Sequence, residues 1–207
     1  MHHMAILRRP FAPDFLGEVA GLGLTALRPL FAQLGRKALL GAQEAGLWDL
    51  PPLVRASLLN QMTAEAKQAS HLWAAVAYHE RDQVHFTGNW QTPTDLHDVL
   101  EAAYHYLLAE REETALELWQ AVSYSLQTSN WQQYRAGDYA TVAAVLQQAI
   151  TAHEELPDEL QHKTQLGKWY FHWAMSLRRM GDSIEEVRPL LVKATHLAPN
   201  NPKPWQA

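Results

Sequence analysis

The sequence predicts an all-α fold, in which helical hairpins stack on one another behind a small N-terminal domain with a short β-hairpin. The first observation is a tight turn followed by an amphipathic helix. Small or apolar residues stand 5, 9 and 12 positions after Gly137, at Val142, Leu146 and Ala149. This spacing places the three side chains on one face of a helix.

The second observation is that the same spacing recurs along the chain. From Glu110 it reaches Ala115, Trp119 and Val122, and from Gly181, with one residue added, it reaches Val187, Leu191 and Ala194. A single hairpin with one apolar face cannot bury that face alone and has to stack on a neighbour. The recurrence therefore predicts an array of stacked helical hairpins.

Composition narrows the classes of protein that the chain can belong to. It has 207 residues, of which 47% are hydrophobic, and it contains no cysteine. A substantial core is therefore expected, whereas disulfides, cysteine zinc sites and thiol nucleophiles are excluded. We predict a cytoplasmic protein without a membrane span, because the chain has neither a long uncharged apolar run nor a signal-peptide pattern at its N-terminus.

Charge is unevenly distributed, although the net charge is only -5. Residues 1–60 carry 6 basic and 4 acidic side chains, residues 61–128 carry 3 and 10, and residues 129–207 carry 8 of each. The acidic middle of the chain would repel phosphate groups, so nucleic acid is not the favoured partner of the predicted array.

We expect residues 5–62 to form the N-terminal domain. The predicted elements are a helix from Pro13 to about Ala20, a helix capped by Thr25 and ended by Gly35, a hairpin from 37–42 and 47–50, and a helix over 53–62. Helices closed by a β-hairpin have the outline of a winged helix.

We expect residues 63–207 to form the helical repeat domain. Thr63 caps a helix over 64–81 with Trp73 facing inward, and residues 84–93 form a loop. Further helices are predicted up to Leu108 and at about 112–128, 139–155, 159–180 and 183–197. Pro189 should bend the last helix, and residues 199–204 should be extended.

The repeats resemble tetratricopeptide repeats (TPR). The resemblance rests on residues 137–139 (GDY), with the apolar positions that follow them, and on residues 181–182 (GD) with Ala194 and Pro199. The two glycines are 44 residues apart, whereas the usual TPR period is about 34. The helices are therefore longer than usual or a turn is inserted.

Four segments in order resemble the regulatory arm of STAND signalling ATPases, the family that includes NB-ARC and MalT-like regulators. They are residues 6–17 (ILRRPFAPDFLG), 51–55 (PPLVR), 71–75 (HLWAA) and 102–110 (AAYHYLLAE). The resemblance implies a winged-helix domain followed by ligand-sensing repeats. It also implies a nucleotide-binding domain upstream, and this chain has no GxxxxGK loop followed by Ser or Thr. Pro51 replaces the histidine that senses the nucleotide in that family.

We find no pattern that points to catalysis, a metal or a cofactor. His71 and His79 are eight residues apart, as are His97 and His105, so each pair is separated by about 12 Å along a helix, too far for one metal ion. The chain contains no HExxH motif, and its serines lack a nearby His–Asp pattern. We therefore predict that the protein is not an enzyme.

The best binding candidates lie on the predicted inner wall of the array. Trp169, His172 and Arg179 share one face of a helix that would be the first of its hairpin, and such helices line the concave side. Trp131 and Tyr134 precede the turn at Gly137. These residues predict a non-catalytic, ligand-sensing module that binds a peptide or another protein.

Two other functions stay open at this point. The chain would be a DNA-binding transcriptional regulator if Arg28, Arg36 and Lys37 lay on one exposed face of a winged helix. It would be an enzyme if a site lay between the two predicted domains. The sequence names neither the ligand nor the oligomeric state, nor whether the chain is a fragment of a longer protein.

Overall fold

The structure is a computed structural model that describes residues 2–85, 93–156, 158 and 161–199. The side chains of residues 2, 84, 85, 93, 94, 123 and 125–135 lie outside this description. Over these residues the fold is all-α apart from one small antiparallel sheet, which confirms the all-α part of the prediction. The chain forms two compact units, the first from residues 1–81 and 105–112 and the second from residues 82–104 and 113–207.

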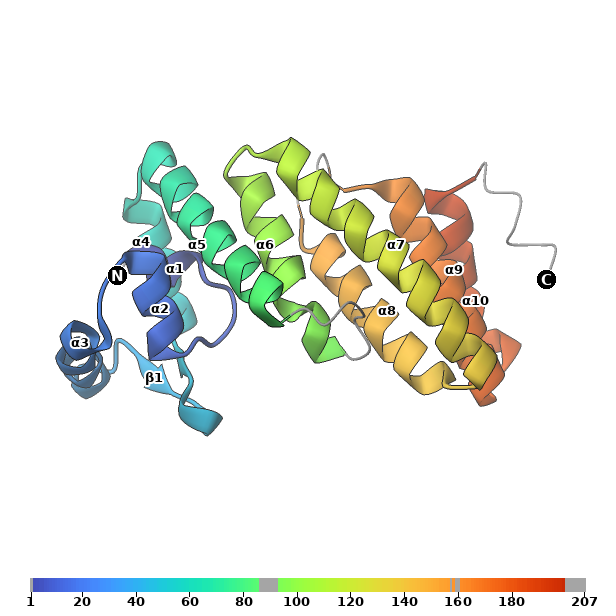
Figure 1. Cartoon of the computed structure of the whole chain (residues 1–207), viewed down its shortest axis with the longest axis horizontal. Coiled ribbons are helices and arrows are strands. Elements are labelled where there is room, and N and C mark those ends of the chain that lie inside the picture. Colours follow the sequence, from blue (N-terminus) through green and yellow to red (C-terminus); the bar gives the residue numbers. More distant parts are fainter. Residues whose placement is uncertain (1, 86–92, 157, 159–160, 200–207) are drawn as a thin grey trace. The chain divides into compact units, whose positions relative to one another are not determined.

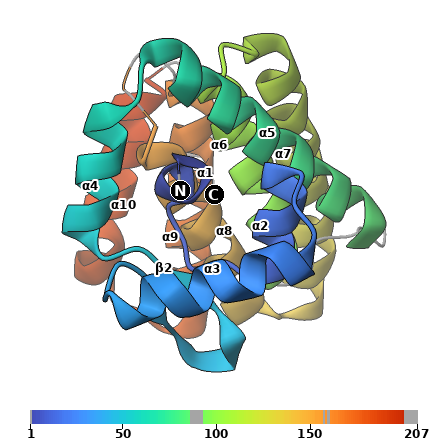
Figure 2. The same ribbon diagram turned by 90° about the vertical axis from the view of Figure 1, so that its left-hand side faces the viewer.

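Unit 1 consists of short helices and one hairpin. Its elements are α1 (His2–Ile6), α2 (Pro13–Ala20), α3 (Leu24–Arg36), β1 (Gly41–Ala42), η1 (Glu44–Gly46), β2 (Trp48–Asp49), α4 (Pro52–Gln61) and most of α5 (Ala64–His85). In Figure 2, α1 lies between α2 and α4, with α3 below it and α5 above it. The predicted hairpin is present, with Gly41 opposite Asp49 and Ala42 opposite Trp48.

Aromatic side chains form much of the core of unit 1. The ring of Phe15 lies 4.3 Å from that of Tyr78, and the ring of Phe31 meets that of Trp48 edge-on at 5.3 Å. All of these except Trp48 are at most 4% exposed. The Phe15 contact ties α2 to α5, so α5 is part of the packing of this unit.

Two details of the predicted helices in unit 1 are wrong. Trp73 is 56% exposed, because the buried face of α5 runs through Ser70, Ala74 and Ala77, which are spaced at four and three residues. In α3 the N-cap is Gly23 rather than Thr25, and the helix continues through Gly35 to Arg36.

Unit 2 consists mainly of long helices. Its elements are η2 (Pro93–Leu96), the first part of α6 (His97–Leu108), α7 (Glu112–Ala136), α8 (Tyr139–Glu154), α9 (Lys163–Met180) and α10 (Ile184–Leu197). Figure 1 shows α7, α8, α9 and α10 side by side. Helix α7 is longer than predicted, since no glycine or proline interrupts it before Gly137.

The recurring apolar positions are the buried face of these helices. Val142, Leu146 and Ala149 on α8 are at most 2% exposed. The equivalent residues Ala115, Trp119, Val122, Val187 and Ala194 are also buried, and Leu191 is half-buried. The spacing found in the sequence therefore identified the packing face of three helices.

The predicted turns also form as expected. Gly181 has a φ of 112°, a left-handed conformation that favours glycine, and its N–H donates to the carbonyl of Arg178 at 3.3 Å. The side chain of Asp138 accepts the N–H of Thr141 at 3.2 Å and so caps α8. Ser183 and Glu186 form a reciprocal capping box at the start of α10.

Helices α9 and α10 approach each other closely at Gly167. A Cβ atom at this position would lie 2.7 Å from the Cβ of Ala198 and 2.9 Å from the carbonyl oxygen of Ala194. The absence of a side chain at Gly167 is thus what allows this approach. Helix α10 continues through Pro189, so the boundary predicted for this helix holds.

A polar cluster of Glu154, Tyr170 and Lys193 links α8, α9 and α10. Tyr170 donates to Glu154 at 2.6 Å, and Lys193 donates to both Tyr170 and Glu154. Burial raises the pKa of Glu154, but the hydrogen bonds from Lys193 and Tyr170 outweigh it and hold this pKa below its ordinary value. The cluster stabilises the arrangement of three consecutive helices.

Within the described ranges, no single helix has both the length and the apolar composition needed to cross a membrane. The helices α2 and α3 together pass that test by length and composition, with a bend of 115° between them. The predicted loop at 84–93 and the predicted extended end fall largely outside the described residues. The predicted domain boundary between residues 62 and 63 stays a prediction.

Candidate functional site

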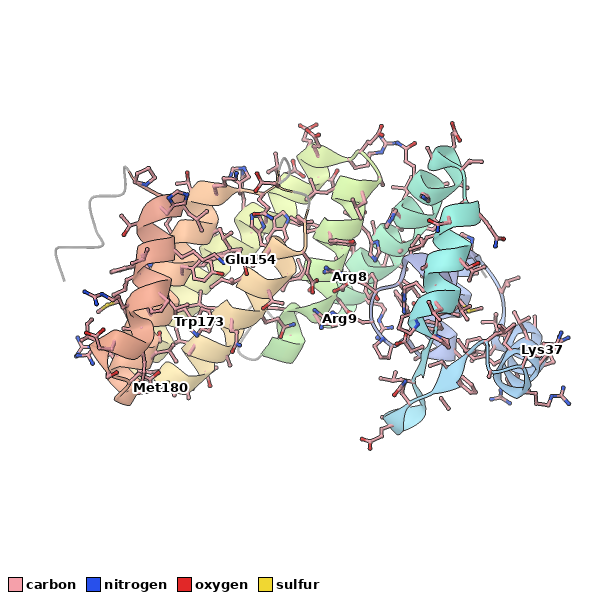
Figure 3. The ribbon with its side chains drawn as sticks, turned by 180° about the vertical axis from the view of Figure 1, so that it is seen from behind. Arg8, Arg9, Lys37, Glu154, Trp173 and Met180 are labelled. Carbon is pink, nitrogen blue, oxygen red and sulfur yellow. The ribbon has the colours of Figure 1, made fainter. Side chains whose placement is uncertain are left out.

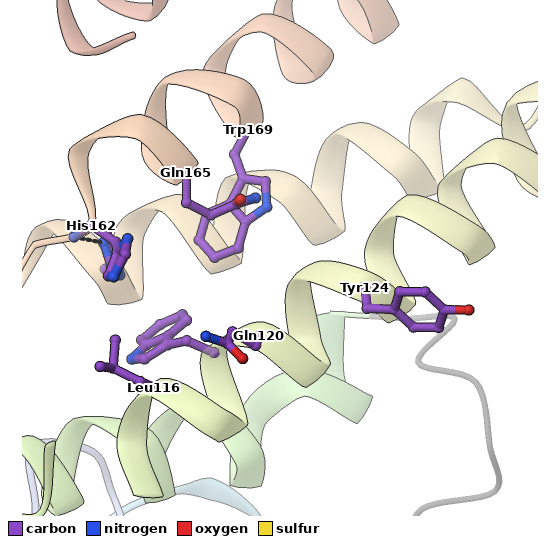
Figure 4. Close-up of a pocket in the computed structure, with 8 residues that line it drawn as sticks. Leu116, Gln120, Tyr124, His162, Gln165 and Trp169 are labelled. Carbon is purple, nitrogen blue, oxygen red and sulfur yellow. Dashed lines mark hydrogen bonds between the residues drawn. The ribbon is translucent and has the colours of Figure 1, made fainter. Parts of the chain in front are cut away.

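A pocket of about 240 Å³ lies in unit 2 among α7, the end of α8 and the start of α9. Its lining consists of Leu116, Trp119, Gln120, Tyr124, His153, His162, Gln165 and Trp169. Figure 4 shows Gln165 and Trp169 on α9 facing Leu116 and Gln120 on α7, whereas Tyr124 points away from them. Tyr124 is 75% exposed, and Gln120 and His162 are exposed as well, so the pocket reaches solvent.

Three aromatic rings form the inner wall of the pocket. The ring of Trp119 meets that of His153 edge-on at 4.7 Å and lies 5.8 Å from that of Trp169. The rings of His153 and Trp169 are also 5.8 Å apart and nearly perpendicular. Edge-to-face contacts of this kind hold rings in fixed orientations, so the wall is rigid and largely apolar.

The orientation of His153 determines which of its nitrogens carries a proton. The backbone N–H of His162 donates to Nε2 of His153 at 2.7 Å, so Nε2 is the acceptor. Burial, together with the smaller effect of the nearby His162, lowers the pKa of His153 to about 4, so the ring is neutral at pH 7. In the neutral ring the proton then lies on Nδ1, which is a donor.

Four buried nitrogen atoms in this lining have no hydrogen-bond partner among the described residues. They are Nε1 of Trp119, Nε1 of Trp169, Nδ1 of His153 and Nε2 of Gln165. A buried donor without an acceptor destabilises a protein by about 1–3 kcal/mol, and most buried polar groups in folded proteins are paired. A group of such donors around one pocket therefore makes it a favourable place for a hydrogen-bond acceptor.

Helical spacing explains how the local sequence brings these side chains together. Leu116, Trp119 and Gln120 are three and four residues apart on α7, and Gln165 and Trp169 are four apart on α9. The last turn of α8 and the residue before α9 supply His153 and His162. The pocket thus depends on three consecutive helices.

The structure separates the predicted binding residues into three groups. Trp169 lines the pocket and is 2% exposed, whereas His172 and Arg179 lie on the exposed surface of α9. Trp131 and Tyr134 lie in α7, and their side chains fall outside the described residues.

Sequence reasoning missed most of the pocket. Trp119 was expected to be a core residue, and it is buried as expected, but it also lines the pocket. His153, Gln165 and Gln120 were not predicted. The spacing of four residues between Gln165 and Trp169 places both side chains on one face of α9. It indicates a shared site only when that face is known to meet α7.

Histidines also come together in unit 1. The Nδ1 atoms of His71 and His105 are 2.8 Å apart, and the ring of Tyr78 stacks on that of His105 at 5.7 Å. Burial lowers the pKa of both histidines, to about 4 for His71. In the part of the chain that the structure describes, no group of three or more His, Cys, Asp or Glu side chains is arranged to hold a metal ion.

No protein-family model matches this chain, and no curated protein or solved structure matches it either. The likeness to TPR and STAND proteins therefore rests on the residues quoted from the sequence.

Proposed function

We propose that the protein is a non-catalytic binding module whose repeat region recognises a peptide or another protein. The main support is the position of the pocket, which is lined by α7 and α9, the first helices of two successive hairpins. In stacked hairpin arrays the first helices form the ligand-binding wall. Among the described residues that line it there is no carboxylate, serine, cysteine or lysine, the groups from which hydrolytic and covalent sites are built.

The surface of α9 extends this binding region beyond the pocket. His172 and Arg179 are exposed on the same helix that supplies Trp169 to the pocket. Arginine pairs well with carboxylates, so a partner with acidic side chains suits this part of α9. The partner would then meet the aromatic pocket and the polar stretch of α9 together.

We further propose that the module is the regulatory arm of a STAND-type signalling protein. The support is the order of the four segments from 6–17 to 102–110. In such a protein, a ligand that binds better to the active arrangement shifts the equilibrium towards it. Any nucleotide would then be bound by a domain upstream.

The proposed function is tested by using the protein as bait and capturing its partners from extracts of the source cell. The wild type is compared with a variant that changes polar side chains on α9. Alanine at Trp169 would leave a cavity, because the side chain is 2% exposed, so the test uses the double variant His172→Ala, Arg179→Glu. We expect it to lose the proteins that the wild type captures.

The matched control is Arg188→Glu on α10, which makes the same charge change at a side chain that is 70% exposed. It should capture the same proteins as the wild type. If the wild type captures no specific protein, or if the double variant captures the same set, the proposal is wrong.

A DNA-binding regulator is the second candidate, favoured by one observation. Arg28, Arg36 and Lys37 are all exposed on or directly after α3, the helix that precedes the hairpin. Figure 3 shows Lys37 at the surface there. This candidate predicts duplex binding that weakens steeply with salt, and no gel shift at low salt would exclude it.

A further inference from the structure

The four donor atoms in the pocket show what kind of ligand would complete it. Indole nitrogens only donate, and the proton on Nδ1 makes His153 a donor as well. The Nε2 atom of Gln165 adds a fourth donor. Because these four atoms lack acceptors among the described residues, the missing group is one that accepts several hydrogen bonds.

The charges of the lining narrow the choice further. The described residues of the lining include no Asp or Glu, so a cationic ligand would find no counter-charge among them. A carboxylate has two oxygens with about four lone-pair sites and accepts from several N–H groups at once. Hydrogen bonds from such donors keep a carboxylate ionised even where little water reaches it.

The size and walls of the pocket indicate the rest of the ligand. A volume of about 240 Å³ exceeds the roughly 150 Å³ of an apolar cavity that binds benzene. It is below the volume of about 300 Å³ at which pockets for drug-sized ligands begin. The rings of Trp119 and Trp169 and the side chain of Leu116 favour an apolar body against them.

We propose that the pocket binds a carboxylate carried on an apolar body about the size of benzoate, an inference that rests on the proposed binding function and gives it a ligand class. The carboxylate oxygens accept from Trp169 and Gln165, which are four residues apart on one face of α9, and the rings of Trp119 and His153 lie beside it. These donor atoms are themselves covered. The half-buried side chain of Gln165 therefore turns aside as the ligand enters.

Two sources would supply this chemistry, a free small acid and the C-terminal residue of a polypeptide. Both offer a carboxylate next to an apolar group. The pocket would recognise this carboxylate in either source, and displacement by peptides distinguishes a free acid from a chain end.

The test uses the full chain, with its indole N–H resonances followed by NMR during titration with benzoate. The resonances of Trp119 and Trp169 are assigned from the Trp→Phe variants. We expect both to shift saturably, with a Kd between about 0.01 and 1 mM for so small a ligand. Benzamide has a similar shape but no negative charge and should produce no shift at the same concentrations.

Two variants and one control on α9 test the donors directly. Trp169→Phe keeps a ring but removes a donor, and it should weaken benzoate binding about tenfold. Gln165→Glu keeps the shape but adds a like charge, and it should abolish binding. Trp173→Phe is the control, because Trp173 lies outside the pocket lining on the same helix (Figure 3).

Several results would overturn the proposal. The first is that neither indole resonance shifts up to about 10 mM benzoate. The second is that benzamide shifts the indole resonances as much as benzoate does. The third is that the Gln165→Glu variant binds benzoate with unchanged affinity, while its dispersed indole resonances show that the variant is folded. A loss of affinity in Trp173→Phe equal to that in Trp169→Phe would also count against it.

Short peptides that end in phenylalanine then identify the source. If a peptide with a free C-terminus displaces benzoate and its amidated form does not, the natural group is a chain end. If neither peptide displaces benzoate, the natural group is a free acid. If benzoate binds but no protein is captured, the carboxylate site is supported and the proposed protein partner is wrong. If a protein is captured but benzoate causes no shift, the protein partner is supported and the carboxylate site is wrong.

Discussion

At the scale of single residues, His153 links the fold to pH. Its Nε2 atom accepts the backbone N–H of His162, just before α9, and its ring makes edge-to-face contacts with Trp119 and Trp169. This arrangement requires the neutral ring, because Nε2 must remain an acceptor. One buried histidine thus joins three helices and shapes the pocket.

We expect the stability of unit 2 to fall as the pH falls from about 6.5 towards 4. An unfolded histidine has a pKa near 6.5, whereas burial lowers the pKa of His153 to about 4 in the fold. Between these values the unfolded chain binds a proton that the folded chain does not, so acid favours unfolding. The stability lost amounts to about 3 kcal/mol at the lower end of this range.

Urea unfolding followed by tryptophan fluorescence at pH 7 and pH 4.5 checks this expectation. His153→Gln should reduce the difference between the two pH values, whereas His196→Gln, at an exposed position of α10, should leave it unchanged. An equal pH dependence in wild type and His153→Gln would contradict the assigned role of this ring.

At the scale of elements, the close approach of α9 and α10 depends on one glycine. The atoms that a Cβ at Gly167 would meet at 2.7 to 2.9 Å include a backbone carbonyl, which cannot turn away as a flexible side chain can. We expect Gly167→Ala to destabilise the protein by about 1–3 kcal/mol, measured as a lower urea midpoint.

Gly35→Ala in α3 is the matched control for that substitution. Its Cβ would lie 3.5 Å from the ring of Trp48, an ordinary contact, and the position is helical. Alanine there should therefore stabilise the helix by about 0.5–1 kcal/mol. If Gly167→Ala and Gly35→Ala change the stability equally, the close approach of α9 and α10 does not explain the need for glycine at position 167.

At the scale of the whole molecule, the two compact units do not follow the chain in simple order. Unit 1 includes α5 up to Arg81 and a later segment, 105–112. Phe15 contacts Tyr78 at 4.3 Å and Arg81 at 4.9 Å, and Gln68 donates to the carbonyl of Ala109. A core of this kind needs residues that lie far apart in the sequence.

We therefore expect a fragment of residues 1–62 to remain largely unfolded, whereas a fragment of residues 1–112 should fold. The shorter fragment leaves Phe15 without the aromatic and cationic partners that cover it. Far-UV circular dichroism with thermal unfolding compares the two fragments. A cooperative transition in the 1–62 fragment would show that the predicted N-terminal domain is autonomous.

The helices could be predicted closely because their signals are local. The starts of α8 and α10 follow from Asp138 and Ser183 as caps, and the end of α9 follows from Gly181 as a stop. Capping involves neighbours within a few residues, so the sequence contains the whole interaction. The buried positions of α8 were predictable for the same reason, since period and small size are local properties.

The exposure of Trp73 and the role of Gln165 could not be predicted in this way. Trp73 lies one position away from the buried face of α5, and a broad apolar stretch does not show which side meets a neighbour. Gln165 is a polar residue whose role in the pocket depends on the two tryptophan side chains that line it too, and one of these, Trp119, comes from α7.

The sequence by itself determined that this chain is helical, where most of its helices begin and end, and which residues of α7, α8 and α10 are buried. These properties arise from interactions between residues a few positions apart. Only the tertiary structure decided that Trp119, His153, Gln165 and Trp169 enclose one pocket with unpaired donors. Three helices have to pack before those four side chains meet, and that packing depends on the fit between whole helix faces.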